Sequence, residues 1–423
     1  MNELNTGAAE MPVAEHVHGK RRNILLGSLF VNFAVLFALY NGVINVLLPN
    51  QVALLDPAHK AANFSFIMFV TLLFTIVATP LAGALSDRVR SPLGRRSPFI
   101  LFATMVGSAA VLCLILMKTV AAIAVCMVVM SFAYNMMQGP MTTIVADRLD
   151  EANRGKGSGF VGAAQTAGGM GGIILAGYLA NRLFTGYAVF ALAIVATSLL
   201  FVVFNREKSS AHDHVEPFHL GRFFTGFWVN PKTYPDFGWA FIGRFLMYLG
   251  IQSVITLQLY ILQDYIHLDV TASNHAMAIL SVITAMTLVI SGLISGYLSD
   301  LLKVYKYFVV FASLVMATAL SIPIMIPTLT GMYIYAAVFG LGYAAFISID
   351  LALITRVLPK RANSSARDMG VMTIANVVPQ ALSPILAVPL LKAFDNNYAV
   401  VFVAAMVCVL MSSLCILPIK SVK

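Results

Sequence analysis

The sequence predicts an all-helical protein that crosses a membrane twelve times, and three observations lead to this prediction. The chain has 423 residues, of which 59% are hydrophobic and only 11% are charged, whereas an average soluble domain is roughly one quarter charged. Apolar segments follow one another almost from end to end, and each is long enough to cross roughly 30 Å of hydrocarbon. Short polar loops separate these segments, so a soluble fold could not bury them all.

The apolar segments fall into two groups of six. Hydropathy and loop residues place the spans at 23–48, 62–86, 98–117, 119–146, 158–181, 187–204, 239–263, 273–298, 305–326, 331–355, 369–392 and 398–419. We expect a cytoplasmic tail at 1–22, a first half at 23–204, a linker at 205–237, a second half at 238–419 and a tail at 420–423. The first span is too long for a signal-peptide core, so it is expected to stay uncleaved.

The basic residues predict the orientation in the membrane. Of the 27 Lys and Arg residues, 22 lie in the two tails and in the loops after even-numbered spans, which share one side. The positive-inside rule therefore predicts cytoplasmic termini in a multi-pass protein of the cell membrane. The net charge of +9 is spread over these loops and not over one clustered face, so the lipid bilayer is the expected partner and nucleic acid is not.

The sequence predicts no metal site. His212, His214 and His219 lie close together in the linker, but no Cys accompanies them, and a solvated linker explains them better than a metal site does. All four cysteines lie inside apolar spans, where a free thiol behaves as a small hydrophobic group.

The two halves repeat one another. The pentapeptide GALSD at Gly83–Asp87 is matched by GYLSD at Gly296–Asp300, and each ends the second span of its half. A second match aligns the segment that ends at Gln165 with the segment that ends at Asn376, at a similar offset. Parallel six-helix repeats are typical of transporters, in which the substrate binds near the midplane between the repeats.

The loop after the second span resembles a known family. The pattern G-x-L-x-D-R followed by G-R-R within Gly83–Phe99 is similar to the signature loop of the major facilitator superfamily. More narrowly, it resembles the loop of sucrose-type transporters and of the glycoside, pentoside and hexuronide cation symporters. The matching residues are Asp87, Arg88, Ser91, Gly94, Arg95, Arg96, Pro98 and Phe99, and Ser97 stands where that branch has a third basic residue.

The resemblance implies a cytoplasmic gate in this loop. Its acid and arginines would join the two halves when the carrier opens outward, and the expected gate residues are Asp87, Arg88, Arg95, Arg96 and Asp300. The alternative is a loop that is positive only to set the topology, but the recurrence of the acid in both halves favours the gate, because topology does not require acids.

One departure from the resemblance concerns the coupling ion. The sodium-coupled melibiose-type permeases carry an acid just before the proline of the second span, where this sequence has Thr79. The span 62–86 holds no carboxylate, and a hard cation such as sodium prefers several oxygen ligands that include negative charge. Sodium coupling at that position is therefore not expected.

Two charges lie well inside spans, Arg244 in the seventh and Asp350 in the tenth. Charges within the hydrocarbon are costly and are usually functional. Each lies about six residues, or roughly 9 Å, from the cytoplasmic end of its helix, so we predict that the two pair or face one pore. Asp350 is the expected proton carrier, and a purely structural ion pair is the alternative.

Amides and tyrosines follow helical stripes in spans 1, 4, 5, 7, 10 and 11. The resemblance implies that spans 1, 4, 7 and 10 line a central cavity. Neutral amides and phenols suit a hydroxyl-rich, uncharged ligand, and aromatic faces can cover sugar C–H groups. Each amide could instead hold two helices together, and we expect this of Asn32. The predicted substrate-binding residues are Asn41, Asn45, Tyr134, Asn135, Gln138, Gln165, Tyr248, Gln252, Tyr343, Asn376 and Gln380.

These features predict a secondary active transporter that moves a small sugar or glycoside with a proton by alternating access, with one chain as the functional unit. No Walker-type pattern is present, so neither ATP nor another cofactor is expected. The first alternative is an exporter of drugs or metabolites with the same fold. The second is a membrane-embedded enzyme, against which the sequence shows no HExxH or GxSxG pattern.

Overall fold

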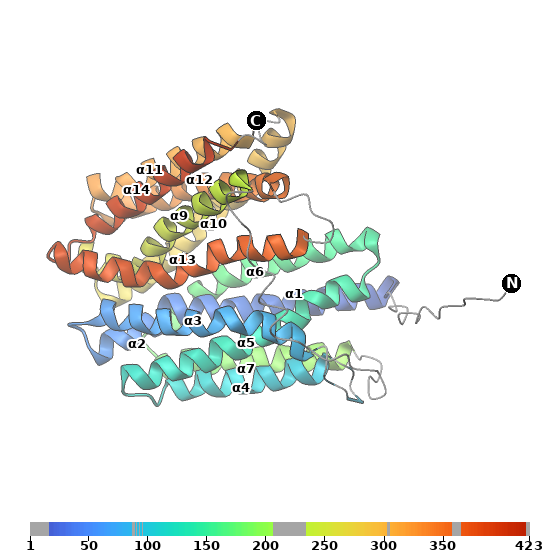
Figure 1. The fold of residues 1–423 in the computed structure, drawn as a ribbon. Helices are drawn as coiled ribbons and strands as arrows, with labels where there is room; N and C mark the ends of the chain where they lie inside the picture. The colour runs from blue at the N-terminus through green and yellow to red at the C-terminus, as the bar shows by residue number, and fades with distance from the viewer. Residues whose placement is uncertain are drawn as a thin grey trace.

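The structure is a computed structural model that describes residues 17–86, 89, 91–92, 94, 96–205, 234–302, 305–357 and 365–419. Within these ranges the side chains of 76–86, 146–147, 151–152, 296–302, 305, 349, 351–357, 365–371 and 373 are not described. The described chain is a bundle of long helices without a strand (Figure 1). Its four cysteines are free.

The helices form two sets of six runs each. The N-terminal set holds α1 (Gly19–Gly42), η1 (Val43–Leu47), α2 (Leu48–Leu55), α3 (Lys60–Ser86), α4 (Ser97–Leu114), α5 (Val120–Arg148), α6 (Glu151–Leu179) and α7 (Leu183–Phe204). The C-terminal set holds α9 (Pro235–Tyr260), η2 (Ile261–Tyr265), α10 (Val270–Leu302), α11 (Tyr305–Met325), α12 (Leu329–Val357), α13 (Ser365–Ala393) and α14 (Ala399–Ile416). In these lists α1–η1–α2 and α9–η2 are continuous runs.

The predicted class of fold is confirmed. Among the described residues, eleven helical runs are long and apolar enough to cross a membrane, and Lys60–Thr75 of α3 is a shorter apolar helix. The first run continues to Leu55, past the expected end at 48, and α6 begins at Glu151, before the expected 158. Hydropathy detects only the apolar part of a helix, so polar turns that extend beyond the hydrocarbon escape it. Most of the predicted linker, residues 206–233 with the three histidines, lies outside the described residues.

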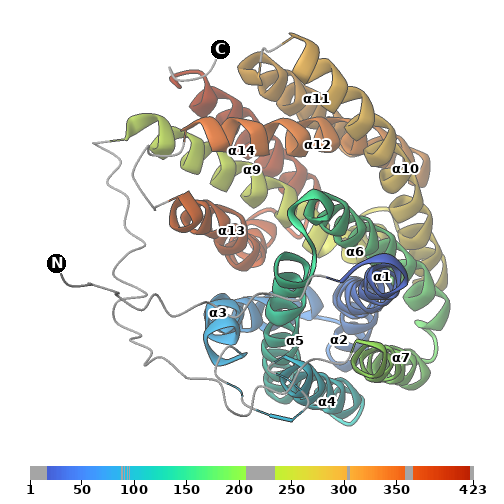
Figure 2. The same cartoon turned by 90° about the vertical axis from the view of Figure 1, so that its right-hand side faces the viewer.

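Within each set the helices pack on one another, and the sets meet along two helix pairs. In the N-terminal set α1 packs on α6 and α7, and α5 packs on α3 and α4; in the C-terminal set α12 packs on α10 and α11, and α9 packs on α13 and α14. The pairs α3 with α13 and α6 with α10 join the sets (Figure 2). These four helices therefore border the interface across which the sets can move.

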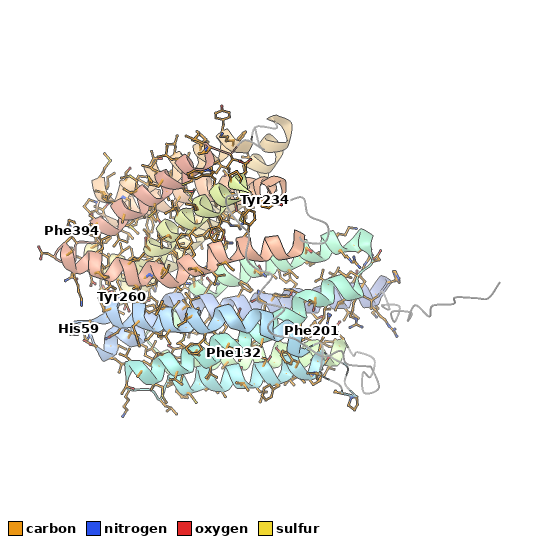
Figure 3. All side chains as sticks on the ribbon, in the orientation of Figure 1. His59, Phe132, Phe201, Tyr234, Tyr260 and Phe394 are labelled. Carbon is orange, nitrogen blue, oxygen red and sulfur yellow. The ribbon has the colours of Figure 1, made fainter. Side chains whose placement is uncertain are left out.

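The two sets converge at the end of the bundle opposite the chain termini, which we call the distal end (Figure 1). His59, which precedes α3, and Phe394, which follows α13, lie at this end together with Tyr260 (Figure 3). Tyr234 and Phe201 lie towards the other end, where α1 begins and α14 ends.

Buried hydroxyl and amide groups hold the N-terminal set together. The Asn32 side-chain amide of α1 donates to Ser198 Oγ of α7 at 3.2 Å, and the Thr104 hydroxyl of α4 donates to the same oxygen at 3.2 Å. All three side chains are buried. Asn32 therefore joins helices, as we predicted.

Glycines let α1 and α6 approach backbone to backbone. An ideal Cβ on Gly168 would lie 2.1 Å from the carbonyl oxygen of Ala34, and one on Gly172 would lie 2.1 Å from that of Ala38. Real side chains do not tolerate such distances, so only glycine permits this contact. Small residues at helix interfaces are a common means of packing in membranes.

The contact predicts a sharp difference between two neighbouring alanine substitutions. Gly172→Ala should lower the thermal unfolding temperature in detergent by several degrees, because overpacking costs about 1–3 kcal/mol. Gly171→Ala is the control, since its Cβ would have no neighbour within 4 Å. Equal unfolding temperatures for the two variants would show that the α1–α6 contact is not tight.

Candidate functional site

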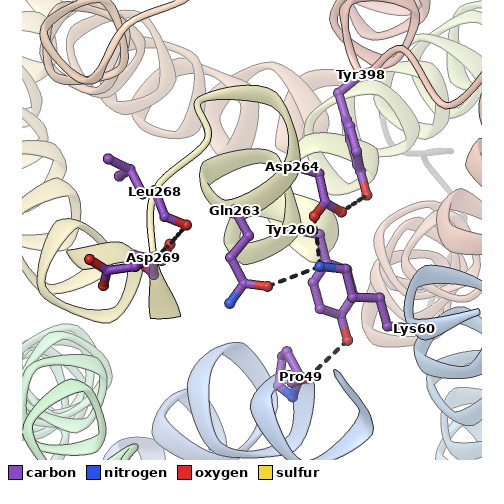
Figure 4. Close-up of polar contacts among 9 residues, drawn as sticks. Pro49, Lys60, Tyr260, Gln263, Asp264, Leu268, Asp269 and Tyr398 are labelled. Atoms are coloured by element: carbon purple, nitrogen blue, oxygen red, sulfur yellow. Dashed lines mark hydrogen bonds and ion pairs between the residues drawn. The ribbon is translucent and has the colours of Figure 1, made fainter. Parts of the chain in front are cut away.

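A network of polar side chains joins the two sets at the distal end (Figure 4). The Lys60 ammonium group, at the start of α3, donates to Asp264 Oδ1 at 2.7 Å and to Gln263 Oε1 at 3.1 Å. The Tyr398 hydroxyl donates to the second oxygen of Asp264 at 3.0 Å. Both carboxylate oxygens are therefore satisfied. We call Lys60, Gln263, Asp264 and Tyr398 the distal cluster.

Apolar and amide contacts surround the distal cluster. The Tyr260 hydroxyl donates to the carbonyl oxygen of Pro49 at 3.1 Å, and its ring meets Phe64 edge to face at 5.8 Å between centroids. The buried amides of Asn50 and Asn274 meet across the sets, with 2.8 Å between Asn50 Nδ2 and Asn274 Oδ1. Together with the cluster, these contacts close the bundle at its distal end.

Sequence reasoning missed the distal cluster. Lys60 counted only as a loop charge, and Asp264 lies just beyond the predicted seventh span. A signal was nevertheless present, because Lys60 is one of only four basic residues on the charge-poor side of the predicted topology. An acid at the end of another span, such as Asp264, is a candidate partner for one of these cations.

The second polar cluster lies within the C-terminal set. Arg244 of α9 pairs with Asp350 of α12, with 3.4 Å between Nε and Oδ2, and their side chains are 13% and 12% exposed. The predicted pairing is therefore confirmed. Arg244 Nε also donates to the side-chain oxygen of Asn376 on α13. Three helices thus meet at one guanidinium group.

Aromatic rings flank this ion pair. The Arg244 guanidinium carbon lies 5.8 Å from the ring centre of Tyr248, within the range of a cation–π contact. Tyr248 meets Phe346 edge to face at 6.4 Å, and Tyr343 stacks on Phe339 at 5.5 Å. The structure therefore gathers Arg244, Tyr248, Tyr343, Asp350 and Asn376 of the predicted residues; we call these five the central cluster.

The predicted amides of the N-terminal set divide between two contacts. Asn41 and Asn45 bond to each other, with 3.3 Å between Asn45 Nδ2 and Asn41 Oδ1, and Asn41 packs against Gly169 of α6. Asn135 of α5 donates to the Tyr40 hydroxyl of α1 at 2.9 Å. Tyr40 was not among the predicted residues, although it precedes Asn41 directly.

Tyr134 meets the second of these contacts only through its ring, which packs edge to face on Tyr40 at 6.0 Å between centroids. It is fully buried, and its hydroxyl pairs with the Ser108 hydroxyl of α4 at 3.0 Å. Its ring fills the space beside Gly107, where a Cβ would come within 2.7 Å of it. The structure therefore places this predicted binding residue in the core between α4 and α5.

The glutamines keep more freedom. The side chains of Gln138 and Gln380 are half-buried and make no hydrogen bond within the described part of the chain. Gln252 Nε2 reaches Thr256 Oγ1 at 3.4 Å. Gln165 lines a cleft of about 350 Å³ between α5 and α6. The other residues that line this cleft are Thr142, Val145, Arg154, Ser158, Val161 and Gly162.

The predicted cytoplasmic gate falls mostly on residues that are not described. Asp87, Arg88 and Arg95 lie outside the described residues, and so does the side chain of Asp300. Arg96 is buried at the start of α4. Among the residues that the structure describes, no group of three His, Cys, Asp or Glu side chains is placed to hold a metal ion.

Similar solved structures are transporters. A bacterial homologue of the human lysosomal transporter Spinster has a TM-score of 0.67 and 15% identity, over 96% of this chain and 99% of that one. The nucleoside transporter NupG has a TM-score of 0.74 and 13% identity, over 93% of this chain and 99% of that one. A D-xylose–proton symporter has a TM-score of 0.68 and 13% identity, over 95% of this chain and 98% of that one. The bundle therefore has the fold of a multi-pass membrane transporter.

The sequence identifies the family. The sequence model of the Major Facilitator Superfamily matches residues 29–384, and it also matches 240–422. The chain belongs to this superfamily. No curated protein matches the sequence.

The distal cluster predicts a change of conformation on loss of one charge. Lys60→Ala or Asp264→Asn should let the distal end open more often, because a partly exposed ion pair is worth about 1 kcal/mol, or roughly a fivefold change in the ratio of conformations. Pulsed electron paramagnetic resonance measures this as a longer distance between spin labels at Ala58→Cys and Asn397→Cys in a cysteine-free background.

A neighbouring carboxylate supplies the control. Within the described residues Asp56 bonds only to His59 and Asn63 of its own set, so Asp56→Asn should leave the label distances unchanged. If Lys60→Ala also left them unchanged, the distal cluster would not hold the two sets together.

Proposed function

We propose that this transporter moves a sugar or glycoside together with a proton. The observation that carries the proposal is the Arg244–Asp350 pair, since a charge pair that is largely removed from solvent inside a membrane protein typically marks an ion or proton path. Protonation of Asp350 would neutralise its carboxylate and weaken its hold on Arg244. Loading of a proton would thereby change the contact between α9 and α12.

The surroundings of the pair support a neutral, hydroxyl-rich solute. Tyr248, Tyr343 and Asn376 offer phenols and an amide, and the nearby rings can cover the C–H face of a sugar. Two of the similar structures are described as transporting D-xylose and nucleosides, which are also hydroxyl-rich. The sequence motif of the loop at Gly83–Phe99 also favours the branch of sucrose-type transporters and glycoside symporters.

Alternating access would use both ends of the bundle. The contacts at the distal end suit a carrier that is closed there and loads or releases solute from the other end. The distribution of basic residues supports a protein of the cell membrane whose two termini lie on the cytoplasmic side. The gate at Asp87, Arg88, Arg95, Arg96 and Asp300 would then close the cytoplasmic side, with the halves at 23–204 and 238–419 moving within a single chain.

Reconstitution in liposomes tests this proposal. Radiolabelled mono- and disaccharides should accumulate under an inward proton gradient and not under a sodium gradient alone. Asp350→Asn should abolish this proton-driven accumulation while exchange of labelled for unlabelled sugar continues, because a residue that never ionises cannot couple the two fluxes.

The control is Asp395→Asn, which changes an exposed carboxylate in the turn after α13 and should leave accumulation intact. Proton-driven accumulation that survives Asp350→Asn would refute the coupling role of Asp350. Absence of sugar uptake with either gradient would favour the exporter instead.

A further inference from the structure

Asn376 and Asp350 compete for one N–H group. The Nε atom of Arg244 carries a single hydrogen, and the structure directs it to the side-chain oxygen of Asn376. The carboxylate of Asp350 lies 3.4 Å from the same nitrogen, so it feels the positive charge without receiving this hydrogen bond. Charge-assisted hydrogen bonds are about twice as strong as neutral ones, so the choice of partner has a large effect on the carboxylate.

Few other groups act on this carboxylate among the side chains that the structure describes. Arg244 and Tyr248 of α9 face Asp350, as does Tyr343 of its own helix. The helices α10 and α11 pack extensively on α12, but their described ionisable groups are engaged elsewhere or exposed. His275 meets Tyr178, Lys306 bonds to carbonyl oxygens after α14, and Tyr307 is exposed.

We propose that Asn376 is a positioning residue that keeps the Nε–H of Arg244 away from Asp350 and so keeps this carboxylate able to bind a proton. The inference rests on the proposed proton coupling and names the residue that tunes it. When a proton binds Asp350, Arg244 keeps its charge and its hydrogen bond to Asn376, and no hydrogen bond is lost. Protonation is thereby easier than it would be for a carboxylate held directly by the arginine.

The position of Asn376 gives this role a structural consequence. Asn376 lies on α13, which packs both on α9 within its own set and on α3 of the other set. A movement of α13 relative to α9 would withdraw the amide oxygen and turn the arginine towards Asp350. The affinity of the site for a proton would then differ between two arrangements of the helices, which coupling requires.

Infrared spectroscopy tests the inference without any transported solute. In wild-type protein in lipid, the stretching band of a protonated carboxyl group should titrate with pH and be absent in Asp350→Asn. Asn376→Ala should move the midpoint of this titration down by about one pH unit, a tenfold loss of proton affinity, because Arg244 can then bond to Asp350. Asn376→Asp should move it up by about one unit, because a second carboxylate shares the arginine and like charges disfavour ionisation.

A polar residue of the same helix provides the control. The buried Ser383 hydroxyl has no hydrogen-bond partner among the residues that the structure describes, so Ser383→Ala should leave the midpoint unchanged. Opposite shifts in the two Asn376 variants would support the positioning role, since loss of structure would not change sign with the substituent. An unchanged or raised midpoint in Asn376→Ala would overturn it, and so would the absence of a band that depends on Asp350. Because the readout needs no sugar, it stands whether or not sugar uptake is found.

Discussion

The hydrocarbon interior cannot stabilise an unpaired charge, and this constraint decides where the polar chemistry of the chain lies. Arg244 and Asp350 satisfy this constraint because they pair across neighbouring helices. Lys60 and Asp264 satisfy it because their pair lies at the distal end. Breaking a buried pair by loss of one partner costs about 3–5 kcal/mol. The helices α9 and α12 are therefore held together for as long as both of their charges remain.

The same constraint made the fold predictable. A span needs about 20 apolar residues, so hydropathy located all twelve helical runs. The equal distance of Arg244 and Asp350 from the predicted cytoplasmic ends of their helices anticipated the contact between them. Asn32 was also correctly assigned to helix packing, because it lies off the stripe of Asn41. The lengths of the helices beyond the membrane were less predictable, as the polar first turns of α6 show.

The choice of partner within a cluster could not be predicted. Spacing along a helix tells which face a residue occupies, but successive residues point about 100° apart, and the neighbouring helix decides what each one meets. Tyr134 and Asn135 are adjacent, yet Tyr134 bonds to Ser108 of α4 and Asn135 bonds to Tyr40 of α1. The bond between Arg244 and Asn376 likewise depends on how α9 and α13 pack.

The ion pairs of the two clusters differ in their exposure to water and therefore in their strength. The Lys60–Asp264 pair is 16% and 37% exposed, so water weakens it, whereas the Arg244–Asp350 pair is only 13% and 12% exposed. Moving two conformations from 1:99 to 99:1 takes about 5.5 kcal/mol of differential binding. If several strongly buried ion pairs held the distal end, the free energy needed to open it would exceed what the binding of one small solute can supply. Single hydrogen bonds, such as those of Tyr260 and Asn50, close the distal end. Each contributes little, so the free-energy difference between the conformations stays small enough for solute binding to change.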